Sequence, residues 1–576
     1  MSVFFNGRLW TTPASMTVVD DSAMHNNNLS VGNVVALIGH STGGAPKTPL
    51  RFRSAAEARS VLRSGDLLTA VEKALHPSNQ SAGPSYVVAM RVDPALQSSA
   101  ILAGTGNESM IELLSTGYGV WTQQIQVKVE NGSSGETGKK KITTRFGSTY
   151  YTADDVGRNA FSVEYSGSGA SPTIDISTTS IELKVAGSSV ASIDLNSFDK
   201  VSQLVDHISS VSGFVASVLE GSGDLPLVNS FETVSGADAA DYTVTANRYE
   251  AVRWFNSISE GLVDATMLSL NANVITNLSN TADDGFVSLT GGVNGSSVAT
   301  DWNDCFSALQ TEDVQWVVPV TADASVHAMA DTHCSFMSDV VQNERRAIVG
   351  TATGTTDEAA ISAALAINSD RTSLVHLGFY DYATDGSTVL REPYILAALL
   401  AGMFSGVNPG TALTNKSINV RGLERKLRNP TDTDRLINGG VFCVEQTSKG
   451  FKVVRSISTW ITNQNYNRVE VSVGTAVDYV ARNVREAVDD LRGWKGAPET
   501  LAIAKRRATA VLEEMARSEP YGAGILAGDD ASPPFKDVVA SLEGDVMRVE
   551  FQCSPVIPVN YIPITIFAVP YSGSTA

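Results

Sequence analysis

Cysteine is scarce in this chain and is not arranged for chemistry. Among 576 residues there are four cysteines, and no two of them have the short spacing of a zinc ribbon, a redox motif or a disulfide framework. Isolated cysteines of this kind behave as small apolar residues. We therefore expect core positions for all of them: Cys305, Cys334, Cys443 and Cys553.

Long apolar runs are also missing. The longest purely apolar window, Tyr394 to Phe404, has about half the length that a membrane-spanning helix needs. The N-terminal stretch MSVFFNGRLW has no basic leader, no long apolar core and no cleavage site, so it does not resemble a secretory signal. These absences predict a protein without membrane insertion that is made and kept in a cytoplasm.

Positive charge is in deficit as well. Lys and Arg number 42 against 61 Asp and Glu, which gives a formal net charge of -19. A phosphate backbone calls for a basic protein face, so nucleic acid is not an expected partner. An acidic surface does suit a soluble protein that accumulates to high concentration.

The length and the changes in composition predict several domains. We expect an N-terminal arm (1–25), the N-terminal part of a core (26–94), a β-rich inserted peripheral domain (95–248), an α/β domain (249–438) and an α+β C-terminal domain (439–576). Ser, Gly and Thr with short alternating strands are typical of the inserted domain. Apolar strands that alternate with amphipathic helices indicate a mainly parallel sheet covered on both faces. The expected fold class is multidomain, α/β and α+β.

The C-terminal domain ends on an unusual strand. Two long helices, Glu470 to Arg492 and Pro498 to Arg517, are expected before a hairpin, Phe535 to Phe551, and a terminal strand, Asn560 to Val569. The terminal strand is apolar on both faces and carries no charge. Proteins normally protect such an edge by charge, shortness or cover. The strand therefore either lies deep in its own subunit or completes a sheet in a neighbouring molecule.

One segment imitates a hydrolase. Gly39 to Gly43 reads GHSTG and matches the GxSxG elbow that presents a nucleophilic serine, here Ser41. An elbow serine leads directly into a helix, whereas Pro46 and Pro49 keep this chain out of a helix until Ser54. A Gly-rich turn is the preferred interpretation, and a serine hydrolase that uses Ser41 is the alternative.

The same segment also imitates a phosphate loop. Gly39 and Gly44 have the required spacing, but Ala45 and Pro46 stand where the lysine and the hydroxyl residue belong. Without the lysine the phosphate cradle is incomplete. No nucleotide cofactor is therefore expected.

A metal site is not expected either. His327, His333 and Cys334 lie within one predicted helix, but a spacing of six places the two histidines on different faces. These residues are interpreted as ordinary helix positions. No catalytic, cofactor-binding or metal-binding residue is assigned, and the chain is not expected to be an enzyme.

A basic cluster interrupts the acidic chain in the last long helix. It consists of Lys505, Arg506 and Arg507. A solvated helix face is the ordinary explanation. The other explanation is an electrostatic dock for an acidic protein partner.

Several stretches, taken in order, resemble the contractile tail sheath proteins of bacteriophages with long contractile tails, the myovirus type. An N-terminal strand, a Gly-rich turn and a helix occur in GNVVALIGHSTGGAPKTPLRFRSAAEARSVL. A small-residue helix and a polar loop occur in EPYILAALLAGMFSGVNPGTALTNKSINV. The C-terminal domain is entered through GGVFCVEQTSKGFKVVRSISTW, and the order of elements from Arg468 to Val569 also matches. The inserted segment Ala95 to Ala246 stands outside the resemblance.

The resemblance implies a structural role. The middle α/β domain would be subtilisin-like in shape without being a protease. Subunits would form six-fold rings around a tail tube in the virion, after assembly in the host cytoplasm, with the tail tube, baseplate and tail terminator proteins as partners. Contraction would drive the tube through the host envelope. A related contractile injection system is the alternative within this class.

The resemblance also implies where subunits join. N-terminal and C-terminal arms would enter neighbouring subunits and complete a small sheet there, and Val3 to Trp10 and Asn560 to Val569 are the matching positions. We expect the basic cluster Lys505 to Arg507 to face the tube. The expected arm contacts are Val3, Phe4, Phe5, Leu9, Ile562, Ile564, Ile566, Phe567 and Val569.

Overall fold

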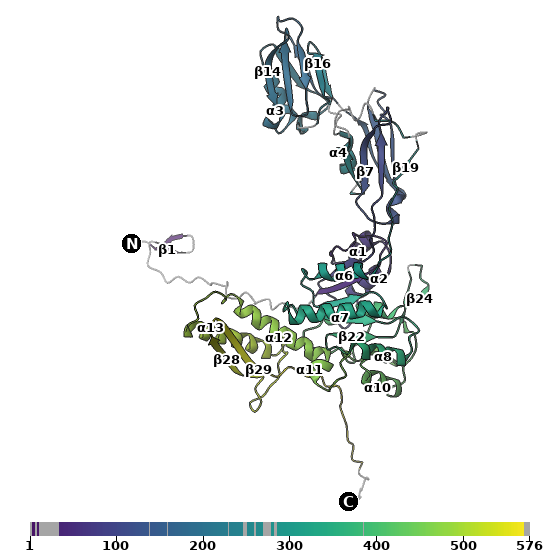
Figure 1. The fold of residues 1–576 in the computed structure, drawn as a ribbon, viewed down its shortest axis with the longest axis vertical. Helices are drawn as coiled ribbons and strands as arrows, with labels where there is room; N and C mark the ends of the chain where they lie inside the picture. Colours follow the sequence, from purple (N-terminus) through teal and green to yellow (C-terminus); the bar gives the residue numbers. More distant parts are fainter. Residues whose placement is uncertain are drawn as a thin grey trace, which may run out of the picture.

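The structure, a computed structural model, describes residues 3–5, 8–10, 34–136, 139–157, 159–227, 230–245, 250–258, 261–268, 278–281, 285–383 and 385–568. Within these residues the chain forms a central body, an insert that projects from the body and a C-terminal domain beside it (Figure 1).

A six-stranded sheet forms the centre of the body. Its strands are β3 (Val34–Gly39), β4 (Leu50–Phe52), β5 (Tyr86–Arg91), β20 (Trp316–Pro319), β21 (Arg346–Gly350) and β22 (Thr372–Val375). In spatial order they run β22-β21-β20-β3-β5-β4, and all neighbours are parallel except β4 and β5. Because β3 pairs with β20, the segments predicted as 26–94 and 249–438 share one sheet.

Helices cover both faces of this sheet, as its apolar strands require. Val35 and Leu37 of β3 pack into the core of one face, and Ala36 and Ile38 pack into the core of the other. The helices of the first face are α1 (Ala55–Leu62), α2 (Asp66–Leu75), α8 (Asp357–Ile367) and α9 (Pro393–Ser405), and those of the second are α6 (Ala299–Leu309) and α7 (Ala324–Asp339).

The longest apolar run is a core helix. Its residues belong to α9, where every side chain from Ile395 to Ser405 is buried. The helix lies against α2 so closely that a Cβ on Gly402 would stand 2.2 Å from the carbonyl oxygen of Ala74. Across the part of the chain that the structure describes, no helix has the length and hydropathy to cross a membrane.

Smaller elements complete the body. They are the sheet of β23 (Phe379–Tyr382), β24 (Thr388–Arg391) and β25 (Gly422–Leu423), the helix α10 (Thr431–Asn438) and the hairpin of β26 (Cys443–Thr447) and β27 (Gly450–Arg455). Cys443, Val444 and Val453 join the core of the body. The predicted boundary at residue 439 is therefore too early, because the first hairpin of the expected C-terminal domain packs on the α/β sheet.

The insert consists of two β-rich units instead of one. The unit next to the body contains β6 (Ser99–Ala103), β7 (Ser109–Ser115), β8 (Ile125–Asn131), β9 (Lys140–Phe146), β10 (Thr149–Val156), α4 (Glu250–Ile258), β18 (Val263–Met267) and β19 (Val287–Ser288). The predicted boundary at 248 and 249 falls inside this unit. The amphipathic helix α4, which resembles the start of an α/β domain in sequence, packs against the β-sheets through Val252 and Phe255.

The second unit is nested within the first and has its own core. Figure 1 shows the first unit between the body and this distal unit. The distal unit contains β11 (Asn159–Tyr165), β12 (Thr173–Ile176), β13 (Ser180–Val185), β14 (Ser188–Asp194), α3 (Val201–Ser209), β15 (Phe214–Val218), β16 (Val234–Asp238) and β17 (Tyr242–Thr245).

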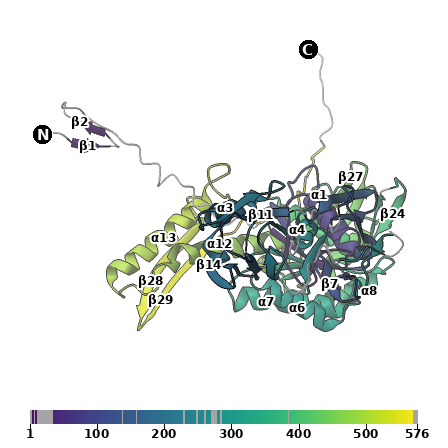
Figure 2. The same ribbon diagram turned by 90° about the horizontal axis from the view of Figure 1, so that it is seen from above.

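The C-terminal domain places two long helices under a hairpin. It contains α11 (Tyr466–Val469), α12 (Val471–Asp489), α13 (Pro498–Ala516), β28 (Phe535–Glu543) and β29 (Val546–Cys553). Viewed from above, these helices and the hairpin lie to one side of the body (Figure 2). The two predicted helices and the predicted hairpin are present within a few residues of their expected bounds. The α/β and α+β multidomain class expected from the sequence is confirmed.

Candidate assembly interface

The segment after β29 is fixed to the subunit as far as Asn560. Leu526 and Pro555 form an antiparallel bridge, and the amide of Val556 donates to the carbonyl of Ile525 at 2.9 Å. The side chain of Asn560 then donates from Nδ2 to Oε1 of Glu470 at 2.8 Å. Asn560 is thus the root of the final segment.

The acceptor of that bond is itself held in place. Glu470 is fully buried and occupies the N-cap position of α12. Its Oε1 atom also accepts from Nε of Arg455 at 2.7 Å, so the carboxylate is paired with a charge. Thr414 adds a 3.3 Å bond from its hydroxyl to Oδ1 of Asn560. The root therefore joins the body, the start of α12 and the chain end.

Beyond the root, the chain leaves the protein surface. We call residues 561–568 the C-terminal arm, and they run away from the body in Figure 1. Exposed fractions are 76% for Ile562, 79% for Ile564, 84% for Ile566 and 86% for Phe567. The strand predicted from Asn560 to Val569 is therefore not formed in the single subunit, because no neighbouring strand is present for residues 560–568; Val569 lies outside the described residues.

The hairpin of β28 and β29 is a sheet of two strands only, within the described chain. One face packs on α12 and α13 through residues such as Val538, Val549 and Phe551. On the other face Val539 and Val546 are about half exposed. Each strand has one paired edge, so each leaves a row of backbone donors and acceptors available for another strand.

The N-terminal arm forms a second small hairpin. The range expected to act as the N-terminal arm, Val3 to Trp10, contains two strands, β1 (Val3–Phe5) and β2 (Arg8–Trp10), which pair antiparallel. They form a separate two-stranded sheet in the described topology. The side chains of the expected contact residues Val3, Phe4, Phe5 and Leu9 lie outside the described part of the structure.

The basic cluster on α13 is divided between two roles. Arg507 donates from Nη1 to the carbonyl of Ala487 at 3.2 Å and forms an ion pair with Asp490, so it ties α13 to the end of α12. Lys505 and Arg506 are exposed on the same helix. Arg507 is partly exposed and paired, so Lys505 and Arg506 are the more exposed residues of the predicted cluster.

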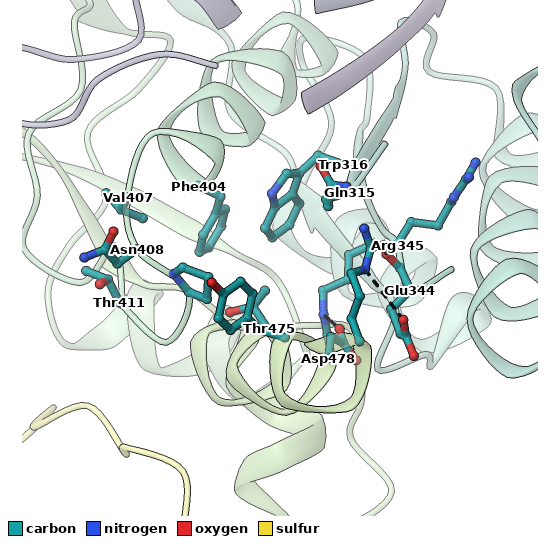
Figure 3. A pocket seen from close by; sticks show the side chains of 14 residues that line it. Gln315, Trp316, Glu344, Arg345, Phe404, Val407, Asn408, Thr411, Thr475 and Asp478 are labelled. Carbon is teal, nitrogen blue, oxygen red and sulfur yellow. Dashed lines mark hydrogen bonds and ion pairs between the residues drawn. The ribbon is translucent and has the colours of Figure 1, made fainter. Parts of the chain in front are cut away.

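A network of charges joins the C-terminal domain to the body. Asp478 on α12 accepts from Arg346 at 2.9 Å and from Arg371 at 2.7 Å, beside a cavity of about 60 Å³ (Figure 3). Gly474 lies one turn earlier, where a Cβ would stand 2.2 Å from Nη2 of Arg346. Arg485 forms a second link to Glu344 at 2.5 Å. Charge pairs at the strand ends thus hold α12 to the sheet.

The hydrolase alternative lacks its geometry. The hydroxyl of Ser41 is buried and donates to the carbonyl of Gly43 at 2.8 Å within its own turn. His40 instead forms a hydrogen bond with Asp93, with 2.7 Å between Nδ1 and Oδ1. This hydrogen bond raises the pKa of the imidazole. The amides of Thr42 and Gly43 donate to the carbonyls of Ser64 and Leu62 at 3.0 Å. Those amides are occupied, so they offer neither an oxyanion hole nor a phosphate cradle.

The histidines of α7 are structural in this fold. His327 bonds through Nε2 to the carbonyl oxygen of Thr321 at 2.9 Å, and His333 accepts from Arg345 at 3.0 Å. Burial raises the pKa of the Cys305 and Cys334 thiols to about 12, so both stay protonated. Among the described residues no group of three or more His, Cys, Asp or Glu side chains could hold a metal ion.

Comparison with known proteins gives relatives over nearly the whole chain. The tail sheath protein of Bacillus phage SP01 is 28% identical over 590 aligned residues, which cover 99% of this chain and 98% of that protein. The putative tail sheath protein of Enterococcus phage phiEF24C is 28% identical and covers 96% of each chain. No family model matches the sequence.

A solved structure shares the fold. The sheath tail protein Lin1278 from Listeria innocua superimposes with a TM-score of 0.54 at 13% identity, over 91% of this chain and 92% of that one. The match spans the body, the insert and the C-terminal domain together. In sequence this chain is thus similar to phage tail sheath proteins, and its fold is that of a solved sheath tail protein.

Proposed function

We propose that the chain is the structural subunit of a contractile phage tail sheath, and that its C-terminal arm joins subunits by strand donation. The proposal rests on two features that occur in the same chain. One is an exposed apolar arm, and the other is a two-stranded hairpin whose outer edges are open. A backbone hydrogen bond contributes about 1 kcal/mol net and does not depend on which side chains slide nearby. Such links keep a lattice connected while subunits move between an extended and a contracted helix.

The remaining partners follow from this role. Subunits stack as six-fold rings around the tail tube in the virion, after assembly in the host cytoplasm, and contact the baseplate and the tail terminator protein at the two ends. The body acts as a rigid spacer, for which a subtilisin-like sheet without a catalytic triad is sufficient. The exposed charges of Lys505 and Arg506 support placing α13 toward the tube.

Contraction needs no nucleotide in this proposal. The extended sheath is a metastable assembly, and a trigger at the baseplate lets the subunits repack with more buried surface. The energy is stored during folding and assembly. The arms prevent the subunits from separating during the change.

Truncation of the arm tests the proposal. A chain that ends at Asn560 keeps the root bonds to Glu470 and Thr414 and should remain a folded, soluble subunit. We expect the full-length chain to form long hollow cylinders in negative-stain images and the truncated chain to form none. Cylinders of normal length from the truncated chain would overturn the role of the arm.

A further inference from the structure

Three ionisable side chains lie where the insert joins the body: His40, Asp93 and Arg91. His40 follows strand β3, Arg91 ends strand β5, and Asp93 comes two residues later, just before the chain enters the insert. Figure 1 shows α1 and α6 at this end of the body. The carboxylate of Asp93 therefore lies between two groups that can carry a positive charge.

The carboxylate of Asp93 is shared unequally between these two groups. Its Oδ1 atom lies 2.7 Å from Nδ1 of His40, whereas its Oδ2 atom lies 3.7 Å from Nε of Arg91. The first distance is that of a charge-assisted hydrogen bond, and the second is too long for a hydrogen bond. The side chain of Asp93 is 9% exposed and that of His40 is 48% exposed, so water can exchange a proton with the imidazole.

Arg91 has an unused donor beside the same carboxylate. Its guanidinium is fully buried, and its Nε atom has no hydrogen-bond partner among the described residues. The other two nitrogens are in use, because Nη1 donates to the carbonyls of Gly44 and Tyr118 and Nη2 donates to the carbonyl of Asn294. A buried donor without an acceptor costs free energy. Arg91 therefore competes for the carboxylate that His40 holds.

The surroundings of His40 favour its charged form. The hydrogen bond to Asp93 raises the pKa of the imidazole above its usual value of 6.5, and Asp66 at the start of α2 adds a second carboxylate, which also accepts from the hydroxyl of Tyr394 at 2.7 Å. On α6 the uncharged ring of Trp302 meets the imidazole edge-on. The other charged groups at this end of α6 pair with each other: Asp301 and Asp304 with Lys47. His40 is thus charged in mildly acidic solution and neutral at alkaline pH.

We propose that Asp93 exchanges partners with pH, binding His40 when the imidazole is charged and Arg91 when it is neutral. The structure shows the first of these arrangements. Loss of the proton to water removes the charge that holds Oδ1 to Nδ1. A small rotation of the carboxylate then brings Oδ2 to the unused Nε atom of Arg91.

The exchange changes which segments are tied together. The neck of the insert is formed by residues 93–96, 116–120 and 292–295, and Arg91 holds it through the carbonyls of Tyr118 and Asn294. In the acidic arrangement, His40 and Asp93 tie the turn after β3, residues 40–43, to this neck. In the alkaline arrangement, Asp93 serves only the neck. The turn is then released while the insert stays attached.

Hydrogen exchange at about pH 5.5 and about pH 9, with each rate corrected for its intrinsic value, tests the release of the turn. The amides of Thr42 and Gly43 donate to carbonyls of the body at 3.0 Å, and we expect their protection to fall by about fivefold at the higher pH. The amide of Val120, which donates to Oδ1 of Asn294 at 3.1 Å in the neck, should keep its protection within about twofold. Peptides from α12 serve as the internal standard.

His40→Gln is the matched variant. Glutamine keeps a donor for Asp93 but carries no charge, so the turn should show the same low protection at both pH values. Unchanged protection of Thr42 and Gly43 in the native chain, or an equal fall in His40→Gln, would overturn the proposal. A fall of the same size at Val120 would overturn it as well, because the neck would then open together with the turn.

Crystal structures at the same two pH values test the exchange of partners itself. We expect the distance between Nε of Arg91 and Oδ2 of Asp93 to shorten from 3.7 Å to about 3 Å at alkaline pH. Release of the turn with these two atoms still 3.7 Å apart would show that His40 only loses its charge, and would contradict the exchange.

Discussion

Within the described chain, Asn560 is the last residue for which a side-chain hydrogen bond to the subunit is seen, and its partner Glu470 is fully buried. The arm starts at the next residue. The position of this root sets the point from which the arm must reach a neighbouring subunit. Glu470 also accepts a hydrogen bond from Arg455, so its carboxylate remains paired with a positive charge when the side chain of Asn560 is removed.

Asn560→Ala should loosen the root without unfolding the domain. The substitution removes a hydrogen bond to a charged group, which is worth about 1.5–3 kcal/mol, although Arg455 continues to pair Glu470. We expect roughly tenfold faster hydrogen exchange at the Val556 amide, because local opening of this segment becomes easier. Unchanged exchange at Val556 would show that the backbone bridge of Leu526 and Pro555 holds the segment alone.

Protonation of His333 makes the free energy of unfolding depend on pH. Its Nε2 atom accepts a hydrogen bond from Arg345, so the folded state requires a neutral ring, and burial beside that cation lowers the pKa to about 3. The ring has a pKa of about 6.5 in the unfolded chain. Between these values only the unfolded state binds the proton, so the free energy of unfolding falls as pH drops from about 6.5 toward 3. His376, with a pKa lowered to about 4, acts in the same direction.

Thermal unfolding across this pH range checks the linkage. We expect the unfolding midpoint of the subunit to fall steadily below about pH 6.5. His333→Gln keeps an acceptor for Arg345 but cannot be protonated, so its midpoint should fall less steeply. Identical slopes for the variant and the native chain would contradict the assignment.

At the scale of elements, the strands and helices with a strong pattern could be predicted from the sequence. The apolar run of β3, the two long C-terminal helices and the hairpin of β28 and β29 all follow from periodicity and turn residues. The nesting of two β units in the insert could not be predicted, because α4 has the pattern of a body helix and only its packing reveals its place. The pairing of β3 with β20 is a long-range contact that local pattern does not encode.

Only part of the candidate interface could be predicted from the sequence. The uncharged terminal strand signalled a need for a partner, but Asn560 and Glu470 form their bond across 90 residues, and no spacing rule links them. Arg507 looked like part of an exposed basic cluster, yet it pairs with Asp490. A helix-wheel argument could have separated Arg507 from Arg506, since Ala504, Ala508 and Val511 mark the buried side of α13.

Arg91 fastens the insert to the body. Its fully buried guanidinium donates from Nη1 to the carbonyl of Tyr118 at 3.2 Å and from Nη2 to the carbonyl of Asn294 at 3.3 Å, which lie on the two passes of chain into and out of the insert. Arg91→Met should lower the free energy of unfolding by about 2–4 kcal/mol, because buried carbonyls lose their donor.

Limited proteolysis measures the local effect of that change. We expect faster cleavage near residues 116–120 in Arg91→Met than in the native chain, while cleavage within the C-terminal domain stays unchanged. Arg51→Met is a suitable control, because Arg51 is mostly exposed and its ion pair with Glu312 lies within the body. Equal cleavage in Arg91→Met and the native chain would show that the insert is held by other contacts.

At the scale of the whole molecule, the insert is separable from the body. Leu96 and Val293 form an antiparallel bridge, so the two passes of the chain are adjacent where the insert begins. The hydrophobic cores on the first face of the body sheet and in the C-terminal domain contain no residue of the insert. The parts of the chain proposed to join subunits all lie outside residues 97–292.

Removal of the insert should therefore spare assembly. A chain in which a Gly-Gly pair replaces residues 97–292 is expected to fold and to form cylinders of reduced diameter in negative-stain images, because only the projecting mass is lost. Circular dichroism of the monomer should show a higher helical fraction than the native chain. A folded deletion variant that does not polymerise would place a subunit contact in the insert.

Strand donation between subunits is tested most directly by an electron cryomicroscopy map of the assembled cylinder. The proposal predicts density for residues 561–568 as a strand added to the hairpin of β28 and β29 in a neighbouring subunit. A map in which this segment folds back on its own subunit, with both edges of that hairpin empty, would contradict it.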